Sequence, residues 1–260
     1  MPNTGTDTGS SLRGRHALVT GSAAGIGKAI CQALLAEGLR VTGADLSPKI
    51  TTALSDPGFQ GVVCDVGDEG AVAKAVEAAC SEGRLDLLVC NAGIFTAGKN
   101  IEDLDDETWN RSLSVNLTGT LRVMRRAIPY LKKGKNASIV VVGSRNAKAP
   151  GPGAAAYSVA KAGMVQLARV AALELAPLGI RVNVVHPDAV FDTDLWTPEV
   201  LARSAARYGL TVDEYKRKNL MKTEIHSADV AAMVCSMAGP AFAKTTGAQV
   251  PVDGGNDRVI

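Results

Sequence analysis

The sequence has no apolar run long enough to span a bilayer, and it has no large excess of charge of either sign. Lys and Arg number 28 and Asp and Glu number 26, which leaves a formal net charge of +2. This balance gives no electrostatic attraction to nucleic acid or to an anionic membrane, so we expect neither as a partner. The first residues also lack the basic start and apolar centre of a secretory signal, so we expect a cytoplasmic protein.

Cysteine is scarce as well, and no two cysteines have the spacing of metal ligands. The five are Cys31, Cys64, Cys80, Cys90 and Cys235, an odd number placed inside apolar stretches. A free cysteine in such a stretch behaves as a small hydrophobic residue. We therefore expect free thiols in a reducing compartment and no metal site.

No internal repeat or linker divides the chain, and 260 residues suit one domain with its own core. We expect a flexible polar tail over residues 1–12 and a single domain over 13–260. Short apolar runs typical of strands alternate with longer helical periods, which indicates βαβ units. The expected strands are 16–20, 41–44, 62–64, 85–90, 138–142, 181–185 and 249–252. The sequence thus predicts an α/β fold, a doubly wound and mostly parallel sheet with helices on both faces.

Three longer segments complete the expected organisation. The acids Asp105-Asp106-Glu107 suit the start of a long helix, because the helix dipole favours negative charge there. A second long helix is expected from about Ala154 to Leu175. No strand pattern occurs between Pro187 and about Ser227, and we expect residues 188–226 to form a lid over a substrate.

A glycine-rich turn joins the first expected strand to the first helix. Its sequence is Thr20-Gly21-Ser22-Ala23-Ala24-Gly25-Ile26-Gly27. Glycines here permit a tight turn and let the backbone approach a pyrophosphate, which the helix N-terminus attracts. The turn predicts a dinucleotide site of the Rossmann type that includes Gly21, Ser22, Ala24, Gly25, Ile26 and Gly27.

Asp45 ends the second expected strand, where an acid accepts hydrogen bonds from the adenosine ribose. No Lys or Arg lies in residues 22–24 or 46–47 to receive a 2′-phosphate, so we expect NAD as the cofactor. Other strand ends meet the same edge of a parallel sheet, where ligands bind. We therefore add to the cofactor site the residues Leu46, Asp65, Val66, Asn91, Ala92 and Gly93.

Tyr157 and Lys161 share one face of the second long helix. A nearby ammonium favours the phenolate form of tyrosine and enables it to exchange a proton. Ser144 follows the fifth expected strand, where its hydroxyl can bond a reacting oxygen. Asn116 lies inside the long helix that begins near Asp105, a position that asparagine disfavours, so we expect it to have a particular role.

With these motifs the chain resembles the short-chain dehydrogenases/reductases, from Gly14 to Val259. Further matches are Asp65-Val66, Arg181-Val182-Asn183 and Asp253-Gly254-Gly255. The resemblance implies that Tyr157 is the general acid/base and that Ser144 positions the substrate oxygen. It implies that Lys161 binds the nicotinamide ribose and lowers the pKa of the tyrosine. It also implies that Asn116 holds a water in the proton relay.

One turn departs from the family pattern, because His186-Pro187-Asp188 stands where the family usually has Pro-Gly. A carboxylate beside the nicotinamide edge either contacts substrate or alters the turn. The family pattern resumes at Val190 and Thr193, where the nicotinamide amide is held. We include Pro187, Val190 and Thr193 in the expected cofactor site.

Three short stretches resemble the dehydrogenase part of bacterial sugar-catabolic rhamnulose-phosphate aldolase/alcohol dehydrogenase proteins. They are Gly143–Ala147, Pro187–Val190 and Lys244–Gly247. The resemblance favours a sugar, polyol or hydroxyaldehyde substrate. Substrate contacts are expected from Ser144, Arg145, Asn146, Tyr157, His186, Asp188 and Trp196. Arg145 suits an anionic substituent or a salt bridge, and Trp196 suits a sugar ring or the packing of the lid.

We expect an NAD-dependent oxidoreductase that moves a hydride between nicotinamide and a secondary alcohol. One alternative is a 3-oxoacyl or quinone-type reductase of the same fold. Another is a nucleotide-binding regulator without catalysis, which would lack the tyrosine or the lysine. The Ala-, Val- and Leu-rich faces around 109–124 and 154–175, together with the family resemblance, predict a homotetramer.

Overall fold

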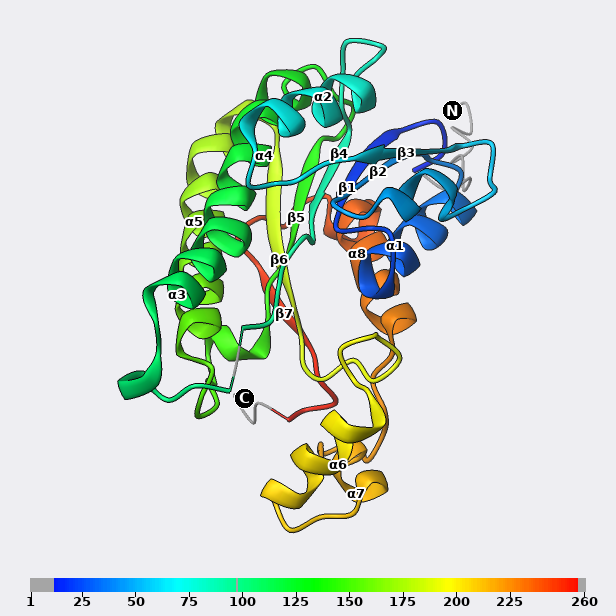
Figure 1. The fold of residues 1–260 in the computed structure, drawn as a ribbon. Coiled ribbons are helices and arrows are strands. Elements are labelled where there is room, and N and C mark those ends of the chain that lie inside the picture. The colour runs from blue at the N-terminus through cyan, green and yellow to red at the C-terminus, as the bar shows by residue number, and fades with distance from the viewer. Residues whose placement is uncertain (1–11, 97, 257–260) are drawn as a thin grey trace.

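The computed structural model describes residues 12–96 and 98–256. Seven parallel strands form one sheet in the order β3-β2-β1-β4-β5-β6-β7 (Figure 1). The strand order reverses between β1 and β4, which defines the doubly wound Rossmann arrangement and confirms the predicted fold class. The strands are β1 His16–Thr20, β2 Arg40–Asp45, β3 Phe59–Val63, β4 Leu87–Cys90, β5 Ser138–Val142, β6 Arg181–Pro187 and β7 Gln249–Val252.

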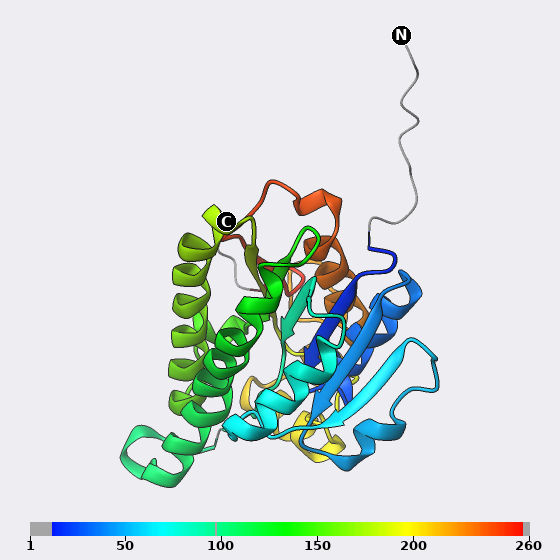
Figure 2. The same ribbon diagram turned by 90° about the horizontal axis from the view of Figure 1, so that it is seen from above.

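Helices cover both faces of the sheet, with α2, α4 and α5 on one side and α1 and α8 on the other (Figures 1 and 2). Successive residues of a strand point to opposite faces. In β1, Leu18 accordingly packs in one core and Ala17 and Val19 in the other. The helices are α1 Gly25–Ala36, α2 Glu69–Ala79, α3 Asp106–Ser112, α4 Gly119–Leu131, α5 Ala155–Leu175, α6 Pro198–Arg207, α7 Val212–Lys216 and α8 Ser227–Ala238.

The strand positions predicted from apolar runs agree with the structure except at a few ends. The fourth strand begins at Leu87 and not at Leu85, because the amide of Leu85 bonds the Tyr130 carbonyl at 3.2 Å instead of a strand. The third strand is Phe59–Val63, earlier than expected. At its start a single apolar residue, Phe59, is followed by Gln60 and Gly61, so no apolar run marks this half of the strand.

The long helix expected after Asp105 is interrupted. Asp105 caps it, and one carboxylate oxygen accepts the Thr108 amide at 2.8 Å. A π-helical turn, Leu113–Thr118, then separates α3 from α4. Turns of this kind are rare and are frequent at functional sites, and this one contains Asn116.

The segment between β6 and α8 carries α6 and α7, which extend beyond the carboxyl ends of the strands (Figure 1). The expected tail, residues 1–12, lies outside the described residues except for Leu12, which is buried in the core. In the part of the chain that the structure describes, no helix combines the length and the apolar character needed to cross a bilayer.

Candidate active site

The glycine turn packs directly against the turn that follows β4. Gly21 and Gly25 have left-handed φ angles of 67° and 51°, which favour glycine. A Cβ on Gly21 would stand 2.6 Å from the Ala92 Cα, and one on Gly27 would stand 2.0 Å from the Gly21 carbonyl oxygen. These contacts leave no room for side chains, so the turn keeps the shape that brings backbone amides to the sheet edge.

The amino end of α1 has the features that a pyrophosphate needs. Its N-cap residue is Ala24, which supplies no side-chain cap, and its first turn contains no acid. The backbone N–H groups of this turn can therefore bond an anion, which the positive end of the helix dipole attracts. Ser22 is fully buried and its hydroxyl donates to the Val19 carbonyl, so it shapes the turn and does not line an open site.

Asp45 is half-buried at the end of β2 and holds the glycine turn in place. One carboxylate oxygen accepts the Ala23 amide at 2.9 Å, and the other accepts the Ser47 amide at 2.8 Å. Leu46 beside it is 68% exposed, an apolar surface next to the expected ribose position. The residues present therefore fit a dinucleotide whose ribose hydroxyls would bond the remaining lone pairs of Asp45.

Asn91 ties the ends of β1 and β4 together. Its side-chain amide donates to the carbonyls of Thr20 and Gly21 at 2.9 and 2.8 Å. The Thr20 hydroxyl in turn accepts the amides of Asn91 and Ala92, each at 3.1 Å. Of the other expected cofactor residues near this edge, Asp65 is exposed. Val66 is buried against Gly119 and acts in packing.

Ser144, Tyr157 and Lys161 come together at the ends of β5 and α5. The Ser144 side chain forms a hydrogen bond with Tyr157. The Lys161 Nζ donates to the Val142 carbonyl at 2.9 Å and lies 5.8 Å from the centre of the Tyr157 ring. The structure therefore brings together the three side chains that the sequence placed in a proton-transfer site.

The pKa values at this site are set mainly by burial. Burial raises the pKa of Tyr157, and the Ser144 hydrogen bond opposes that rise only in part. The net direction is opposite to the lowering expected from Lys161. Burial also lowers the pKa of Lys161 itself to about 8, and the Cys90 thiol opposes that shift. A lysine that is 4% exposed thus loses its proton far more readily than one in water.

Asn116 is fully buried in the π-helical turn and holds the backbone beside Gly93. Its Oδ1 accepts the Ile94 amide at 3.0 Å, and its Nδ2 donates to the carbonyls of Ile94 and Ser112 at 3.1 and 3.0 Å. A Cβ on Gly93 would stand 2.6 Å from Asn116 Oδ1 and 3.6 Å from Lys161 Nζ. The side chain therefore positions the turn that faces Lys161.

His186 is not brought to the substrate side of the site. It is 1% exposed, and its ring nitrogens lie 3.0 Å from the Ser144 carbonyl oxygen and 3.3 Å from Gln249 Oε1. Burial lowers its pKa, which favours the neutral ring. His186 therefore supports the backbone of Ser144 from behind, in place of the expected substrate contact.

Asp188 links the ends of three strands. Its carboxylate accepts a hydrogen bond from the Asn256 amide after β7 and lies 3.7 Å from the Arg145 Nε after β5. Arg145 thus has a carboxylate partner within the protein. Of its two expected roles, this favours the salt bridge over a contact with an anionic substituent of the substrate. Asn146 is half-buried, and its backbone amide donates to the Ser144 hydroxyl at 3.1 Å.

The segment after β6 returns to the glycine turn and then forms α6 and α7. The Thr193 Cγ2 lies 3.3 Å from where a Cβ on Gly25 would stand, so Thr193 lies beside the glycine turn. Pro187 and Val190 are buried, and Val190 pairs with Ile225. Trp196 packs on Phe191 and Tyr215, with ring centres 5.1 and 6.0 Å away. Of the two expected roles of Trp196, this contact favours packing within the segment over stacking on a sugar ring.

The sequence model of a protein family described as enoyl-(acyl carrier protein) reductase matches residues 21–257 of this chain. The chain belongs to the short-chain dehydrogenase/reductase family. It is an oxidoreductase that acts on CH–OH groups, and one solved structure of the same fold is complexed with NADH. The expected family membership is confirmed.

A relative in Bacillus subtilis, the uncharacterized oxidoreductase YuxG, is 37% identical over 254 residues. The match covers 92% of this chain but 37% of YuxG, so the chain spans well under half the length of that relative. Two solved structures resemble the short-chain dehydrogenase fold of this chain along nearly all of their length.

The first is 3-ketoacyl-(acyl-carrier-protein) reductase of Brucella melitensis complexed with NADH, with a TM-score of 0.83 and 28% identity. It covers 95% of this chain and all of its own. The second is aldohexose dehydrogenase of Thermoplasma acidophilum, with a TM-score of 0.84 and 29% identity. It covers 96% of this chain and 97% of its own.

Three residues at the site of this short-chain dehydrogenase were not predicted, because no sequence motif marks them. Phe95 packs its edge on Tyr157 with ring centres 4.9 Å apart. Asn256 bonds Asp188, and Lys218 lies over the rings of Tyr208 and Tyr215 at 4.5 and 4.8 Å. Their partners are distant in sequence, so only the fold reveals them. Among the described residues no cluster of His, Cys, Asp or Glu can hold a metal ion.

The lowered pKa of Lys161 predicts a specific pH dependence of stability. Between about pH 8 and its ordinary value of 10.5, the unfolded chain binds a proton at this lysine that the folded chain lacks. Stability therefore rises with pH through that window, because the cost of burying the ammonium disappears. We expect the free energy of unfolding of the unmodified protein to rise relative to that of Lys161→Met as the pH is raised.

Urea unfolding of both proteins from about pH 7 to about pH 10.5 measures this difference. The same substitution at the exposed Lys74 is the control and should show no such window. Parallel pH profiles of the unmodified protein and Lys161→Met would contradict the assignment.

Proposed function

We propose that this short-chain dehydrogenase oxidises a secondary alcohol with NAD, and that Ser144, Tyr157 and Lys161 perform the proton transfer. The observation that carries the proposal is the Ser144–Tyr157 hydrogen bond in front of the buried Lys161. Bound NAD supplies the hydride acceptor. It would lie along the glycine turn, with its ribose at Asp45 and its nicotinamide end near Thr193.

In this proposal the Tyr157 phenolate oxygen takes the proton of the substrate alcohol and becomes a hydroxyl, while the carbon loses its hydride. The Ser144 hydroxyl bonds the reacting oxygen and aligns it with Tyr157. The Lys161 ammonium would bind the nicotinamide ribose, and its positive charge would favour the phenolate that the burial of Tyr157 opposes. Asn116 would maintain the adjacent turn and the water relay implied by the family.

A polyhydroxylated substrate suits the polar groups that meet at this edge of the sheet. Arg145, Asn146 and Asp188 follow β5 and β6, and the charges of Arg145 and Asp188 face each other. A pocket with such groups rejects ligands that leave them unpaired. The aldohexose dehydrogenase likeness supports a sugar or polyol, and the segment 188–226 would close over it as a lid.

The same enzyme could instead reduce an acyl ketone, as the name of the ketoacyl reductase neighbour suggests. The paired charges of Arg145 and Asp188 disfavour a long apolar chain, because it would leave both of them desolvated and without a new partner. We therefore rank the sugar or polyol first and include an acyl ketone among the test substrates.

NAD reduction across sugars, sugar acids and polyols tests the function, with a long-chain alcohol and an acyl ketone for comparison. We expect a sugar or polyol to be turned over fastest. Tyr157→Phe should lower that activity by about 10²-fold or more while NAD binding stays nearly unchanged. Tyr130→Phe on α4 is the control and should keep full activity. Faster turnover of the long-chain alcohol or acyl ketone would refute the substrate class, and an active Tyr157→Phe would refute the mechanism.

Asp45 should make NAD the preferred cofactor, because its carboxylate bonds ribose hydroxyls and repels a 2′-phosphate. A hydrogen bond to a charged group is worth about 1.5–3 kcal/mol, so Asp45→Ser should lower kcat/KM for NAD about tenfold or more. The preference over NADP should fall with it. Asp56→Ser removes an exposed acid before β3 and should change neither value. Equal or better kcat/KM with NADP in the unmodified enzyme would exclude this role.

The outer surface of α4 and α5 supports assembly into a homotetramer, and the two helices lie side by side in Figure 1. Exposed apolar side chains on them are Leu121, Val159, Val170 and Leu173, the last 77% exposed. A second copy would cover them in a symmetric contact. Light scattering should give four times the chain mass at micromolar concentration, and Leu173→Glu should weaken assembly. A stable monomer would rule out the tetramer.

The five free thiols support a cytoplasmic enzyme.

A further inference from the structure

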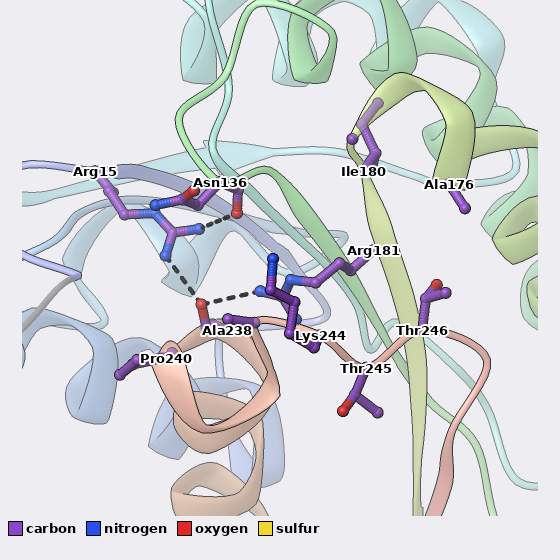
Figure 3. A pocket seen from close by; sticks show the side chains of 13 residues that line it. Arg15, Asn136, Ala176, Ile180, Arg181, Ala238, Pro240, Lys244, Thr245 and Thr246 are labelled. Atoms are coloured by element: carbon purple, nitrogen blue, oxygen red, sulfur yellow. Dashed lines mark hydrogen bonds between the residues drawn. The ribbon is translucent and has the colours of Figure 1, made fainter.

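A hollow lies at the end of the sheet opposite the candidate active site. It is a cavity of about 360 Å³ beside the carboxyl end of α8 (Figure 3). Arg15 precedes β1 and Arg181 begins β6, so both lie at the amino ends of strands, whereas Ser144 and Asp45 lie at carboxyl ends. The cavity is therefore separate from the dinucleotide site.

Three cations line the cavity, and its lining contains no acid. They are Arg15, Arg181 and Lys244. Arg15 is 4% exposed and donates to the carbonyls of Ala238 and Asn136 at 2.9 and 3.0 Å. The backbone carbonyl of Asp86 accepts another bond from Arg15 at 3.1 Å.

The two arginines bond the same backbone carbonyl, and neither forms a hydrogen bond with a carboxylate among the described residues. Arg181 donates to the carbonyls of Met237 and Ala238 at 2.8 and 3.3 Å, so both guanidinium groups meet at Ala238 (Figure 3). Burial lowers the pKa of both; for Arg15 the Asp86 carboxylate opposes this shift and the charge of Arg181 adds to it. Within residues 12–96 and 98–256, none of Arg15, Arg181 and Lys244 forms an ion pair.

Hydrogen-bond donors remain in the cavity after these contacts. A guanidinium has five N–H groups, and the Arg181 bonds to Met237 and Ala238 do not use all of them. The Lys244 amine and the Thr245 hydroxyl bond no other group in the described part of the chain. The carbonyl end of α8 offsets the positive charge only in part, because a helix terminus carries about half an elementary charge.

We propose that this cavity binds a small oxyanion, a phosphorylated or multiply carboxylated metabolite, between Arg181 and Lys244. A carboxylate or phosphate would accept bonds from these side chains and supply the negative charge that the lining lacks. The volume exceeds that of a single ion and lies in the range of small-molecule pockets. Because the site is remote from Tyr157, its ligand takes no part in the chemistry and stabilises the folded chain.

Thermal unfolding with added inorganic phosphate, and separately with citrate, tests the site. Saturating NAD is present so that phosphate cannot act at α1, and NaCl keeps the ionic strength constant. We expect Tm to rise by at least about 2 °C and to saturate, as binding to the folded state requires. The larger rise tells which of the two anion classes the cavity prefers.

Two substitutions at Lys244 assign the effect to the cavity. Lys244→Ala should remove most of the rise, whereas Lys74→Ala on α2 should keep it. Lys244→Glu places a carboxylate between the arginines, so it should raise Tm without added anion and abolish the response to phosphate. A rise that does not saturate, or one that persists in Lys244→Ala, would overturn the proposal.

Discussion

The contact between the turns after β1 and β4 is the constraint on which the whole active edge depends. The strand order reverses at this point, so the helices that follow β1 and β4 leave on opposite faces of the sheet. Asn91 joins the two turns through its bonds to the carbonyls of Thr20 and Gly21. The glycines are required because the two turns touch at backbone distance. The amides of α1 thereby reach the ligand edge of the sheet.

The polar groups of the candidate site are held by buried polar groups behind them. Asn116 uses its amide to hold Ile94, and His186 uses a ring nitrogen to hold the carbonyl of Ser144. Neither residue has more than 1% of its surface exposed. Buried polar groups are stable when they are bonded, and in that state they define one geometry. The orientation of Ser144 toward Tyr157 thus depends on His186 in the neighbouring strand as well as on the loop that follows β5.

The sequence predicted what depends on local pattern. The apolar runs placed β1, β5 and β7 to the residue, and the glycine turn and the Tyr157–Lys161 pair were found from their spacing. Residues whose environment depends on distant segments were misjudged. His186 was polar at a strand end and was expected to face substrate, but the packing of Gln249 and Ser144 encloses it. The pKa of Tyr157 was expected to fall, but burial, which spacing does not reveal, raises it.

Helix α8 joins the two ends of the sheet that have been assigned different roles. At its amino end, the amide of Ser227 donates to the Asp192 carboxylate at 2.8 Å, in the segment that leads from β6 to α6. At its carboxyl end, Arg15 and Arg181 hold the carbonyls of Met237 and Ala238. The helix packs along α1, whose first turn is the expected pyrophosphate site. A helix fixed at both ends in this way holds α1 and the segment after β6 in a constant relation.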